Sequence, residues 1–381
     1  MSATDNRAIV HMDLDSFFVS VERLKDPSLI GKPIAIGGTQ RGVVASCSYE
    51  ARKFGVHSAM PSVTAKRLCP QLVFIKHDMQ DYSRYSRMVT DIIARESPLF
   101  EKSSIDEFYI DISGMEKFFG SWKWACGLKQ KIVEETGLPI SFGLSINKIV
   151  SKIATREAKP NGQLQVLAGQ EKAFLAPLPI GKIPMLGKKS EEALQGLGLY
   201  TIGDLAAAPV KKLEKILGKS GKYFWERANG IDNSTVEPDW ERKSMSSETT
   251  FREDSSDKEA IRIILFKIAE ELCYDLRKEG LLTGCVTVKI KYADFEVQSM
   301  QTTIPYTSSD HLVMERVQEL FKKVYKGVRP IRLAGVRFSH LIYGSPQLSM
   351  FENDIKAMKL YKAMDDIRKK FGNDAVGRAF E

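Results

Sequence analysis

Short apolar segments alternate with helical patterns over the first 165 residues, and some of these segments end in acidic residues. The first, Arg7 to Leu14, predicts a buried strand that is followed by a helix over 16–25. We expect further strands at 33–36, 42–46, 140–145 and, in two pieces, 100–113, and further helices at 48–54, 62–68, 81–97, 121–136 and 147–158. This alternation, with antiparallel elements included, predicts an α+β fold.

The pattern changes after residue 166. Gly and Pro separate short helices as far as residue 236, which indicates a small all-helical segment. The polar stretch 237–247 is interpreted as a linker. A second α+β domain is expected beyond it, with helices at 257–278 and 310–325 and strands at 286–292, 300–304 and 331–342. A last amphipathic helix is predicted over 356–371.

Length and composition narrow the class of protein. A chain of 381 residues is long enough for two to three domains. No run approaches the ~18 apolar residues of a membrane span, and the first seven residues are polar, so we expect neither a membrane segment nor a secretory signal. The five scattered cysteines include no CxxC pair, which is typical of reduced thiols in a cytoplasmic protein.

The chain is basic, with 56 Lys and Arg against 48 Asp and Glu. The first 235 residues hold 32 of these basic and 25 of these acidic side chains, so nearly all of the surplus lies there. A surplus of this size permits a polyanionic partner, and it also fits an ordinary globular protein. Charge therefore favours neither function class by itself.

Three carboxylates lie at predicted strand ends. Asp13 closes the first strand, and Asp106 and Glu107 follow a polar break at Ser103–Ser104. Mg²⁺ prefers carboxylate oxygens, and two ions ~3.5–4 Å apart need carboxylates from more than one strand. Asp13 and Asp106 suit this role if their strands are neighbours. Taken singly, each acid is as readily explained as a surface group at a strand end.

Two other readings of these acids remain open at this point. The segment Asp13-Leu-Asp-Ser fits the DxDx[ST] start of aspartyl-phosphate phosphohydrolases, in which Asp13 is a nucleophile. That reading needs a later acidic pair, and Asp365-Asp366 lies within a predicted helix. The alternative without catalysis is a DNA-binding protein with helix-hairpin-helix elements and incidental acids.

Five motifs in order make the pattern specific. They are Met12-Asp-Leu-Asp-Ser-Phe-Phe-Val-Ser-Val-Glu, Ser48-Tyr-Glu-Ala-Arg-Lys-Phe-Gly-Val, Ser104-Ile-Asp-Glu, Gly143-Leu-Ser-Ile-Asn-Lys and Lys159-Pro-Asn-Gly. Each is weak alone, but their order and spacing together resemble the Y-family translesion DNA polymerases of the DinB type. The resemblance covers the chain from about residue 6 to about residue 351.

The resemblance implies a right-hand polymerase architecture. We expect a ferredoxin-like palm, small fingers, a helical thumb with a helix-hairpin-helix and an α+β little finger. The corresponding ranges are 1–18 and 77–165 for the palm, 19–76 for the fingers, 166–236 for the thumb, 237–247 for the linker, 248–345 for the little finger and 346–381 for a clamp-binding peptide and helical tail.

The resemblance also implies the activity: template-directed, error-prone addition of dNTPs to a primer 3′-OH, without proofreading. Asp13, Asp106 and Glu107 are then the catalytic carboxylates, and together with the Leu14 carbonyl they hold two Mg²⁺ ions, for which Mn²⁺ can substitute. Primer-template DNA and dNTPs are the expected substrates of a monomeric chain. Asp15 is interpreted as a helix cap and not as a metal ligand.

Several residues match the family's nucleotide contacts. Phe18 corresponds to the steric gate, whose ring collides with a ribose 2′-hydroxyl, and Phe17 is the neighbouring aromatic that packs. Without the resemblance, both would be read as core aromatics. The remaining contacts to the incoming nucleotide are Ser46, Tyr49, Arg52 and Lys159.

The segment from Lys182 to Leu194 resembles a helix-hairpin-helix, whose backbone N–H groups bind DNA phosphates. Gly187, Lys188 and Lys189 match it, whereas Met185 replaces the usual first Gly and leaves the hairpin geometry open. In the little finger, Lys289 and Lys291 should point to one side of a strand, and Arg329, Arg332 and Arg337 could join them.

The segment Gln347-Leu348-Ser-Met350-Phe351 resembles the peptide by which bacterial polymerases dock on the sliding clamp. One polar anchor and two apolar side chains would fill a pocket in an extended conformation. Met350 stands where Leu is usual, and its adaptable side chain makes the change tolerable. The alternative is a chance match in a loop.

Overall fold

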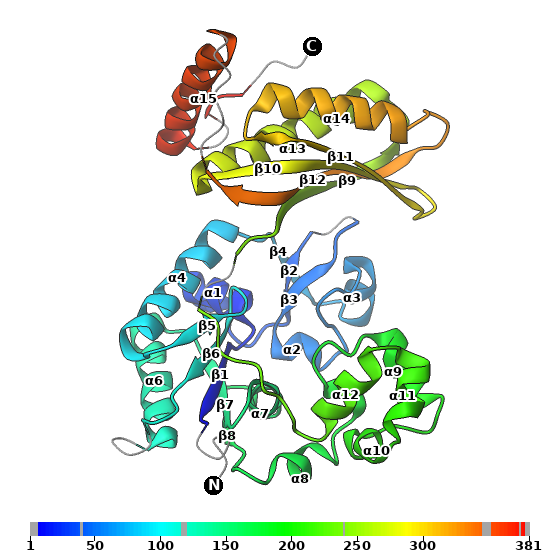
Figure 1. Cartoon of the computed structure of the whole chain (residues 1–381). Helices are drawn as coiled ribbons and strands as arrows, with labels where there is room; N and C mark the ends of the chain where they lie inside the picture. Colours follow the sequence, from blue (N-terminus) through cyan, green and yellow to red (C-terminus); the bar gives the residue numbers. More distant parts are fainter. Residues whose placement is uncertain are drawn as a thin grey trace. The chain divides into compact units, whose positions relative to one another are not determined.

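The chain divides into two units, Met1–Trp240 and Glu241–Glu381, each with its own sheets and core (Figure 1). In this computed structural model, the described residues are 7–38, 41–115, 120–238, 241–344, 352–372 and 375–377. None of the helices in these ranges is long and apolar enough to cross a membrane.

A five-stranded sheet organises the first unit. In spatial order its strands are β5 (Phe100–Lys102), β6 (Glu107–Asp111), β1 (Ile9–Leu14), β7 (Ile140–Ser145) and β8 (Gln163–Gln165). The central strand β1 is antiparallel to both β6 and β7, and the edge strand β8 is parallel to β7. The first apolar segment of the chain is therefore the middle of this sheet.

The two faces of β1 meet different helices. Val10, Met12 and Leu14 join an apolar core with α4 (Met79–Glu96) and α6 (Ser121–Thr136). Successive strand residues point to opposite faces, so Ile9, His11 and Asp13 lie on the side of α7 (Lys148–Ala158). A Cβ on Gly143 in β7 would come within 2.3 Å of the Ser151 carbonyl oxygen, so glycine permits the close approach of α7.

A smaller sheet forms a second layer of this unit. Its order is β3 (Val44–Cys47), β2 (Ile34–Gly37) and β4 (Val73–Ile75), and it has its own small apolar cluster. The associated helices are α1 (Phe17–Lys25), the 3-10 turn η1 (Pro27–Leu29), α2 (Tyr49–Arg52) and α3 (Ser62–Leu68).

Five short helices and one 3-10 turn complete the first unit. They are α8 (Glu171–Leu175), η2 (Ile180–Lys182), α9 (Lys188–Gln195), α10 (Ile202–Ala207), α11 (Val210–Leu217) and α12 (Ser220–Ala228). Their apolar side chains share one core with residues of α7, including Val150 and Ile153. The all-helical segment that the Gly and Pro spacing predicted is confirmed.

The second unit packs helices on one face of a four-stranded antiparallel sheet. The sheet order is β11 (Val297–Thr307), β10 (Leu281–Tyr292), β12 (Ile331–Tyr343) and β9 (Ser244–Ser255). Core residues Val286, Val288 and Ile290 of β10 point to the same side as α13 (Lys258–Glu279) and α14 (Asp310–Val324). The last helix is α15 (Glu352–Phe371).

Most predicted elements lie within a few residues of their expected bounds, and the helices at 62–68 and 121–136 and the strand at 140–145 match fully. The three-residue strands β4 and β8 and the twelve-residue strand β9 were not predicted, because very short segments and polar segments show little apolar periodicity. The linker prediction for 237–247 is wrong at its end, since β9 begins at Ser244 and pairs with β12. Pairing across the sheet makes a strand of this polar segment.

Candidate active site

The predicted carboxylates lie on neighbouring strands. Asp13 near the end of β1 is the direct cross-strand partner of Glu107 at the start of β6. The Leu14 N–H donates to the Asp106 carbonyl at 3.1 Å, so Asp106 lies beside the same strand end. The neighbourhood of strands that the metal-site hypothesis required is confirmed.

Each carboxylate is held by a partner of its own. Lys159 Nζ lies 2.5 Å from Asp13 Oδ1, Lys152 Nζ lies 2.5 Å from Glu107 Oε2, and the Ser104 hydroxyl donates to Asp106 Oδ1 at 2.6 Å. Among the described residues, no three His, Cys, Asp or Glu side chains converge as a finished metal-binding group. Lys152 was not among the predicted site residues, although its position one turn after Lys148 on α7 places it near the same strands.

Asp13 carries an electrostatic cost. Burial raises the pKa of Asp13 to about 7, Lys159 lowers it, and the negative charges of Glu107 and Asp106 raise it again. On the same face of β1, burial and the nearby Lys152 lower the pKa of His11 well below its usual value, so this ring adds no positive charge. Crowded, partly desolvated carboxylates of this kind are stabilised by a bound cation.

The donor atoms suit a divalent cation. Lys159 Nζ lies 2.5 Å from Asp13 Oδ1 and 3.2 Å from the Leu14 carbonyl oxygen, so a positive group already contacts two of the predicted ligand atoms. All predicted ligands are carboxylate or carbonyl oxygens, which Mg²⁺ and Mn²⁺ prefer. The residues present therefore fit the metal that the resemblance implies.

The Asp15 side chain does not have the predicted role of a helix cap. The residue before α1 is Ser16, and no side chain caps this helix, so the interpretation of Asp15 as a helix cap is wrong. Its carboxylate instead accepts hydrogen bonds from the Tyr49 and Ser141 hydroxyls and from the Asn161 N–H. Because these partners are far from Asp15 along the chain, no local pattern in the sequence indicates that they bind it.

Three of the predicted nucleotide contacts, Tyr49, Arg52 and Lys159, lie around this strand end. The Tyr49 hydroxyl donates to Asp15 Oδ1 at 3.2 Å, and the Arg52 guanidinium lies 4.7 Å from the centre of the Tyr49 ring. Arg52 also reaches the Ser16 hydroxyl at 3.5 Å. Ser46 lies on the neighbouring strand β3, opposite Ile36 of β2. Tyr49, Arg52 and Lys159 thus approach Asp13 from two separate segments.

Phe17 and Phe18 differ as predicted in their surroundings. Phe17 is buried in the apolar core of the first unit, whereas Phe18 is only partly buried and packs against the edge of that core. The Phe18 ring stacks on Tyr82 at 4.2 Å with an interplanar angle of 11°. The Tyr82 hydroxyl donates to buried Glu22 at 2.8 Å. Tyr82, which the sequence analysis did not single out, therefore fixes the Phe18 ring.

The hairpin segment keeps its turn although Met185 replaces glycine. Met185 has φ of 66°, in the left-handed region that glycine ordinarily occupies, and its side chain is 85% exposed. Gly187 then forms the N-cap of α9, and Lys188 and Lys189 follow as exposed residues of its first turn. The substitution strains the backbone but does not abolish the turn.

The basic residues of the second unit divide into two groups. Lys289, Lys291 and Arg337 lie on the sheet face opposite the core, because Lys289 is paired with Gly335 and Arg337 with Thr287. Lys289 is also paired with Glu248 at 2.8 Å. Arg329 pairs with Asp294 and Glu296, which lie outside the strands, and Arg332 lies over the Phe295 ring, as Lys291 does. The predicted common face therefore holds for three of the five.

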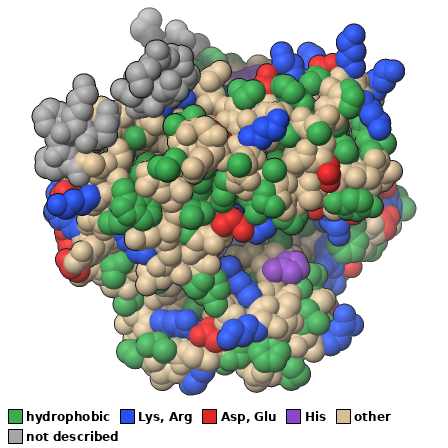
Figure 2. All heavy atoms as spheres, turned by 90° about the horizontal axis from the view of Figure 1, so that it is seen from below, with side chains coloured by type: hydrophobic (Ala, Val, Ile, Leu, Met, Phe, Trp, Pro, Cys, Tyr) green, Lys and Arg blue, Asp and Glu red, His purple; other side chains and the backbone are tan. Residues whose placement is uncertain are grey.

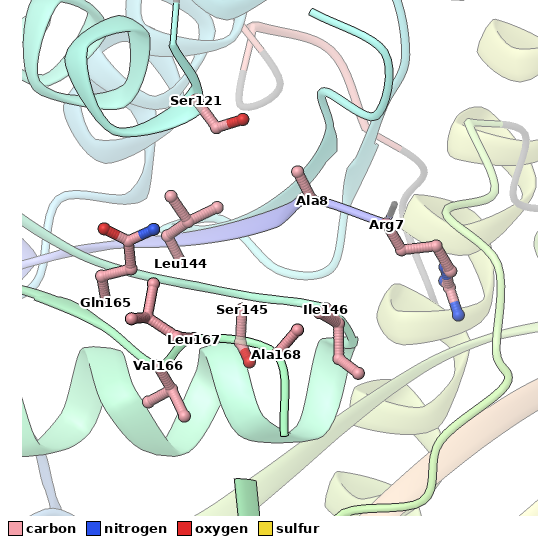
Figure 3. A pocket seen from close by; sticks show the side chains of 10 residues that line it. All are labelled: Arg7, Ala8, Ser121, Leu144, Ser145, Ile146, Gln165, Val166, Leu167 and Ala168. Atoms are coloured by element: carbon pink, nitrogen blue, oxygen red, sulfur yellow. The ribbon is translucent and has the colours of Figure 1, made fainter. Parts of the chain in front are cut away.

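A pocket of about 180 Å³ lies at the opposite end of β1 from Asp13 (Figure 3). Arg7 and Ala8, just before β1, line it, and Ser121, Leu144 and Gln165 line it from three other segments. It contains no acidic residue. Figure 2 shows Lys and Arg side chains scattered among acidic and hydrophobic ones on the face seen from below. Neither the pocket nor this surface indicates a second candidate for the active site.

The predicted clamp-binding residues Gln347, Leu348, Met350 and Phe351 lie outside the described residues. The structure describes the segments on both sides of them, β12 up to Tyr343 and α15 from Glu352. The amphipathic helix predicted over 356–371 is confirmed and is four residues longer at its start.

Comparison with known sequences decides among the alternatives. Residues 12–156 match the impB/mucB/samB family, residues 242–350 match the C-terminal domain of that family, and residues 169–199 match the IMS family HHH motif. The chain belongs to the impB/mucB/samB family. A protein named DNA polymerase IV from Dehalococcoides mccartyi is 40% identical to it, over 98% of both chains.

Solved structures agree with this assignment. A Y-family DNA polymerase chimera of Dbh and Dpo4 is 27% identical and matches with a TM-score of 0.81, over 88% of this chain and all of that one. An insertion ternary complex of Dbh DNA polymerase is 25% identical, with a TM-score of 0.64 over the same shares. The chain is a Y-family, DNA-directed DNA polymerase of translesion synthesis, and the family resemblance, the fold class and the function inferred from the sequence are confirmed.

Proposed function

We propose that Asp13, Asp106 and Glu107, with the Leu14 carbonyl, form the metal site at which this polymerase adds dNTPs to a primer 3′-OH. The observation that carries this proposal is the cross-strand pairing of Asp13 with Glu107, beside Asp106, around a carboxyl group whose pKa is raised to about 7. Two bound Mg²⁺ ions, or Mn²⁺ in their place, would supply charge neutralisation for the attacking and leaving oxygens.

The remaining residues bind and orient the incoming nucleotide. Tyr49, Arg52 and Lys159 approach the carboxylates from α2 and from the loop after α7, and cationic and hydroxyl donors suit a triphosphate. Ser46 on β3 is proposed to add a hydroxyl donor. When carboxylate oxygens of the site are occupied by metal, Lys159 is free to pair with phosphate instead of Asp13.

Phe18 is proposed as the steric gate that selects deoxynucleotides. Its ring is fixed by stacking on Tyr82, and the hydrogen bond from Tyr82 to Glu22 fixes Tyr82 in turn. A rigid ring excludes a ribose 2′-hydroxyl better than a mobile ring does, because a mobile ring could move away and relieve the steric clash. Phe17 supports the same strand-to-helix junction from within the core.

The domain names follow from the same assignment. The five-stranded sheet is proposed as the palm (1–18 and 77–165), the three-stranded sheet as the fingers (19–76), and helices α8 to α12 as the thumb (166–236). Residues 248–345 of the second unit are proposed as the little finger. DNA phosphates would contact Gly187, Lys188 and Lys189 of the thumb hairpin and the exposed sheet residues Lys289, Lys291 and Arg337.

A sliding clamp is the proposed partner of the segment 347–351, on the strength of its sequence. Phe351→Ala should abolish retention of the chain on immobilised clamp, while primer extension without clamp stays at the wild-type level. Unchanged retention would contradict this role. The five free cysteines agree with a reducing, cytoplasmic location, and a monomer is proposed.

Primer extension tests the central proposal. Purified chain should extend a labelled primer on a template with Mg²⁺ and dNTPs, and EDTA should stop it. Asp106→Ala should lower kcat on the order of 10³-fold, since several kcal/mol of charge stabilisation depend on the metal site. The control is binding of primer-template DNA, which this variant should retain. Normal synthesis by Asp106→Ala would refute the carboxylate assignment.

A further inference from the structure

Asp15 joins three segments that are far apart in the sequence. The side chain lies two residues after Asp13 and is 2% exposed. Its Oδ1 accepts a hydrogen bond from the Tyr49 hydroxyl of α2 at 3.2 Å. The Ser141 hydroxyl of β7 lies 3.1 and 2.9 Å from the two carboxylate oxygens. The backbone N–H of Asn161 donates to Oδ2 at 2.7 Å.

The loop that carries Lys159 depends on this carboxylate. The Asn161 N–H bonds to Asp15 directly, and the Gly162 N–H donates to the Ser141 hydroxyl at 3.1 Å, which itself donates to Asp15. Two consecutive backbone donors of the loop are therefore tied to one buried group. Lys159 lies only two residues before Asn161, and its ammonium, which contacts Asp13 and the Leu14 carbonyl, also lies 3.6 Å from Asp15 Oδ1.

The same carboxylate holds the other nucleotide-binding segment. Tyr49 belongs to the short helix α2, and its ring lies 4.7 Å from the Arg52 guanidinium. Burial and the nearby charge of Asp15 raise the pKa of Tyr49, so its hydroxyl stays protonated and able to donate. Tyr49 and the loop after α7 therefore share one acceptor, the Asp15 carboxylate.

We propose that Asp15 is a positioning residue that sets the distance between Lys159 and Tyr49 for the triphosphate of the incoming nucleotide. The inference rests on the triphosphate roles proposed above for those two residues. Asp15 acts through them and not on the reacting atoms, because protein donors from three segments already occupy its carboxylate oxygens. A buried carboxylate with several donors of this kind orders the groups that bind it.

The variants of this site differ in which hydrogen bonds they keep. Asp15→Ala removes every acceptor and leaves the Asn161 N–H, which can only donate, without a partner. Asp15→Asn keeps one acceptor oxygen for that N–H, and the Ser141 and Tyr49 hydroxyls can reverse their roles toward its amide. Ser141→Ala removes only the bridge to Gly162. Asp257→Ala is the matched control, since Asp257 also accepts from two backbone N–H groups but belongs to the second unit.

Single-nucleotide incorporation on a saturating primer-template tests the proposal. Asp15→Ala should raise the KM for dNTP roughly ten- to hundredfold, with a smaller change in kcat, because misplaced contacts weaken nucleotide binding. Asp15→Asn should recover most of this loss, and Ser141→Ala should raise the KM about threefold. Asp257→Ala should leave the KM unchanged, and all four variants should bind primer-template DNA as the wild type does.

The outcomes separate this inference from the function on which it rests. Loss of stability with an unchanged KM in Asp15→Ala and Ser141→Ala would show a structural role alone and overturn the proposal. If Asp15→Ala does not fold, the KM of Ser141→Ala decides in the same way. A wild-type chain without metal-dependent incorporation contradicts the proposed site itself, whereas an active wild type with unaltered variants contradicts only the role of Asp15.

Discussion

The two units differ in the charges that surround their buried ionisable side chains. In the first, three carboxylates crowd the end of β1 and the start of β6, and burial together with neighbouring negative charge raises the pKa of Asp13 to about 7. In the second, buried charges lie beside charges of the opposite sign. Arg368 pairs with Glu270, both 6% exposed, and Arg277 pairs with Asp310 and Asp365.

This contrast distinguishes a functional site from a structural one. Like charges brought together in a partly buried place destabilise the fold unless a cation joins them, so they remain where chemistry needs them. Matched pairs hold segments together, and in the second unit they attach α13 to α15 and to α14. Variants of the first unit should therefore change activity more than stability, and variants of the second should do the reverse.

The largest expected effect lies in the second unit. Arg368→Ala leaves Glu270 buried without its partner, and we expect the free energy of unfolding to fall by about 3–5 kcal/mol. The KM for dNTP should not change. Denaturant unfolding measures the first quantity and single-nucleotide incorporation the second. The control is Arg316→Ala, whose pair with Glu319 is largely exposed and should contribute little.

A change in selectivity should follow at the first unit. Phe18→Ala removes the ring stacked on Tyr82 and should lower the preference for dNTP over rNTP on the order of 10²-fold, at a small cost in stability. The ratio of kcat/KM for dNTP to kcat/KM for rNTP measures this preference. The sugar selectivity of Phe18→Leu, which keeps part of the side-chain bulk, should lie between that of Phe18→Ala and that of the wild type. Equal selectivity in all three proteins would remove Phe18 from the gate role.

The smallest expected effect is a pH dependence of stability. The pKa of Asp13 is about 7 in the folded chain against an ordinary value of 3.8, so folding favours the protonated form. Without metal, its contribution is fully present below about pH 4 and is lost as the pH rises through about 7; between pH 5 and pH 8 this loss is roughly 3 kcal/mol.

Unfolding in EDTA at pH 5 and pH 8 should show this loss in the wild type and not in Asp13→Asn. Excess Mg²⁺ at pH 8 should restore the stability of the wild type, because a ligand that binds only the folded state stabilises it. Identical pH profiles for the two proteins would mean that Asp13 is paired well enough with Lys159 to be an ordinary salt bridge, and the contrast between the units would weaken.

Local pattern in the sequence was enough to place most helices and strands and to put the carboxylates at strand ends, whereas the role of Phe18 came only from the family resemblance. Apolar periodicity and polar breaks are local properties, so the strand ending in Asp13 and the broken pair of strands around Asp106 were predictable. The family resemblance needed only the order of short motifs. Very short strands such as β4 and β8 carry too little pattern to be predicted, and β9 is a strand because β12 pairs with it.

Only the tertiary structure decided which partner each acidic group has. Asp15 looked like a helix cap because a cap is the nearest role for an acid before a helix, but its donors come from residues 49, 141 and 161. Tyr82 under Phe18 and Lys152 beside Glu107 are likewise set by how α4 and α7 pack on the sheet. Hydrogen bonds and charges act over a few ångströms in space, and distance along the chain does not report that separation.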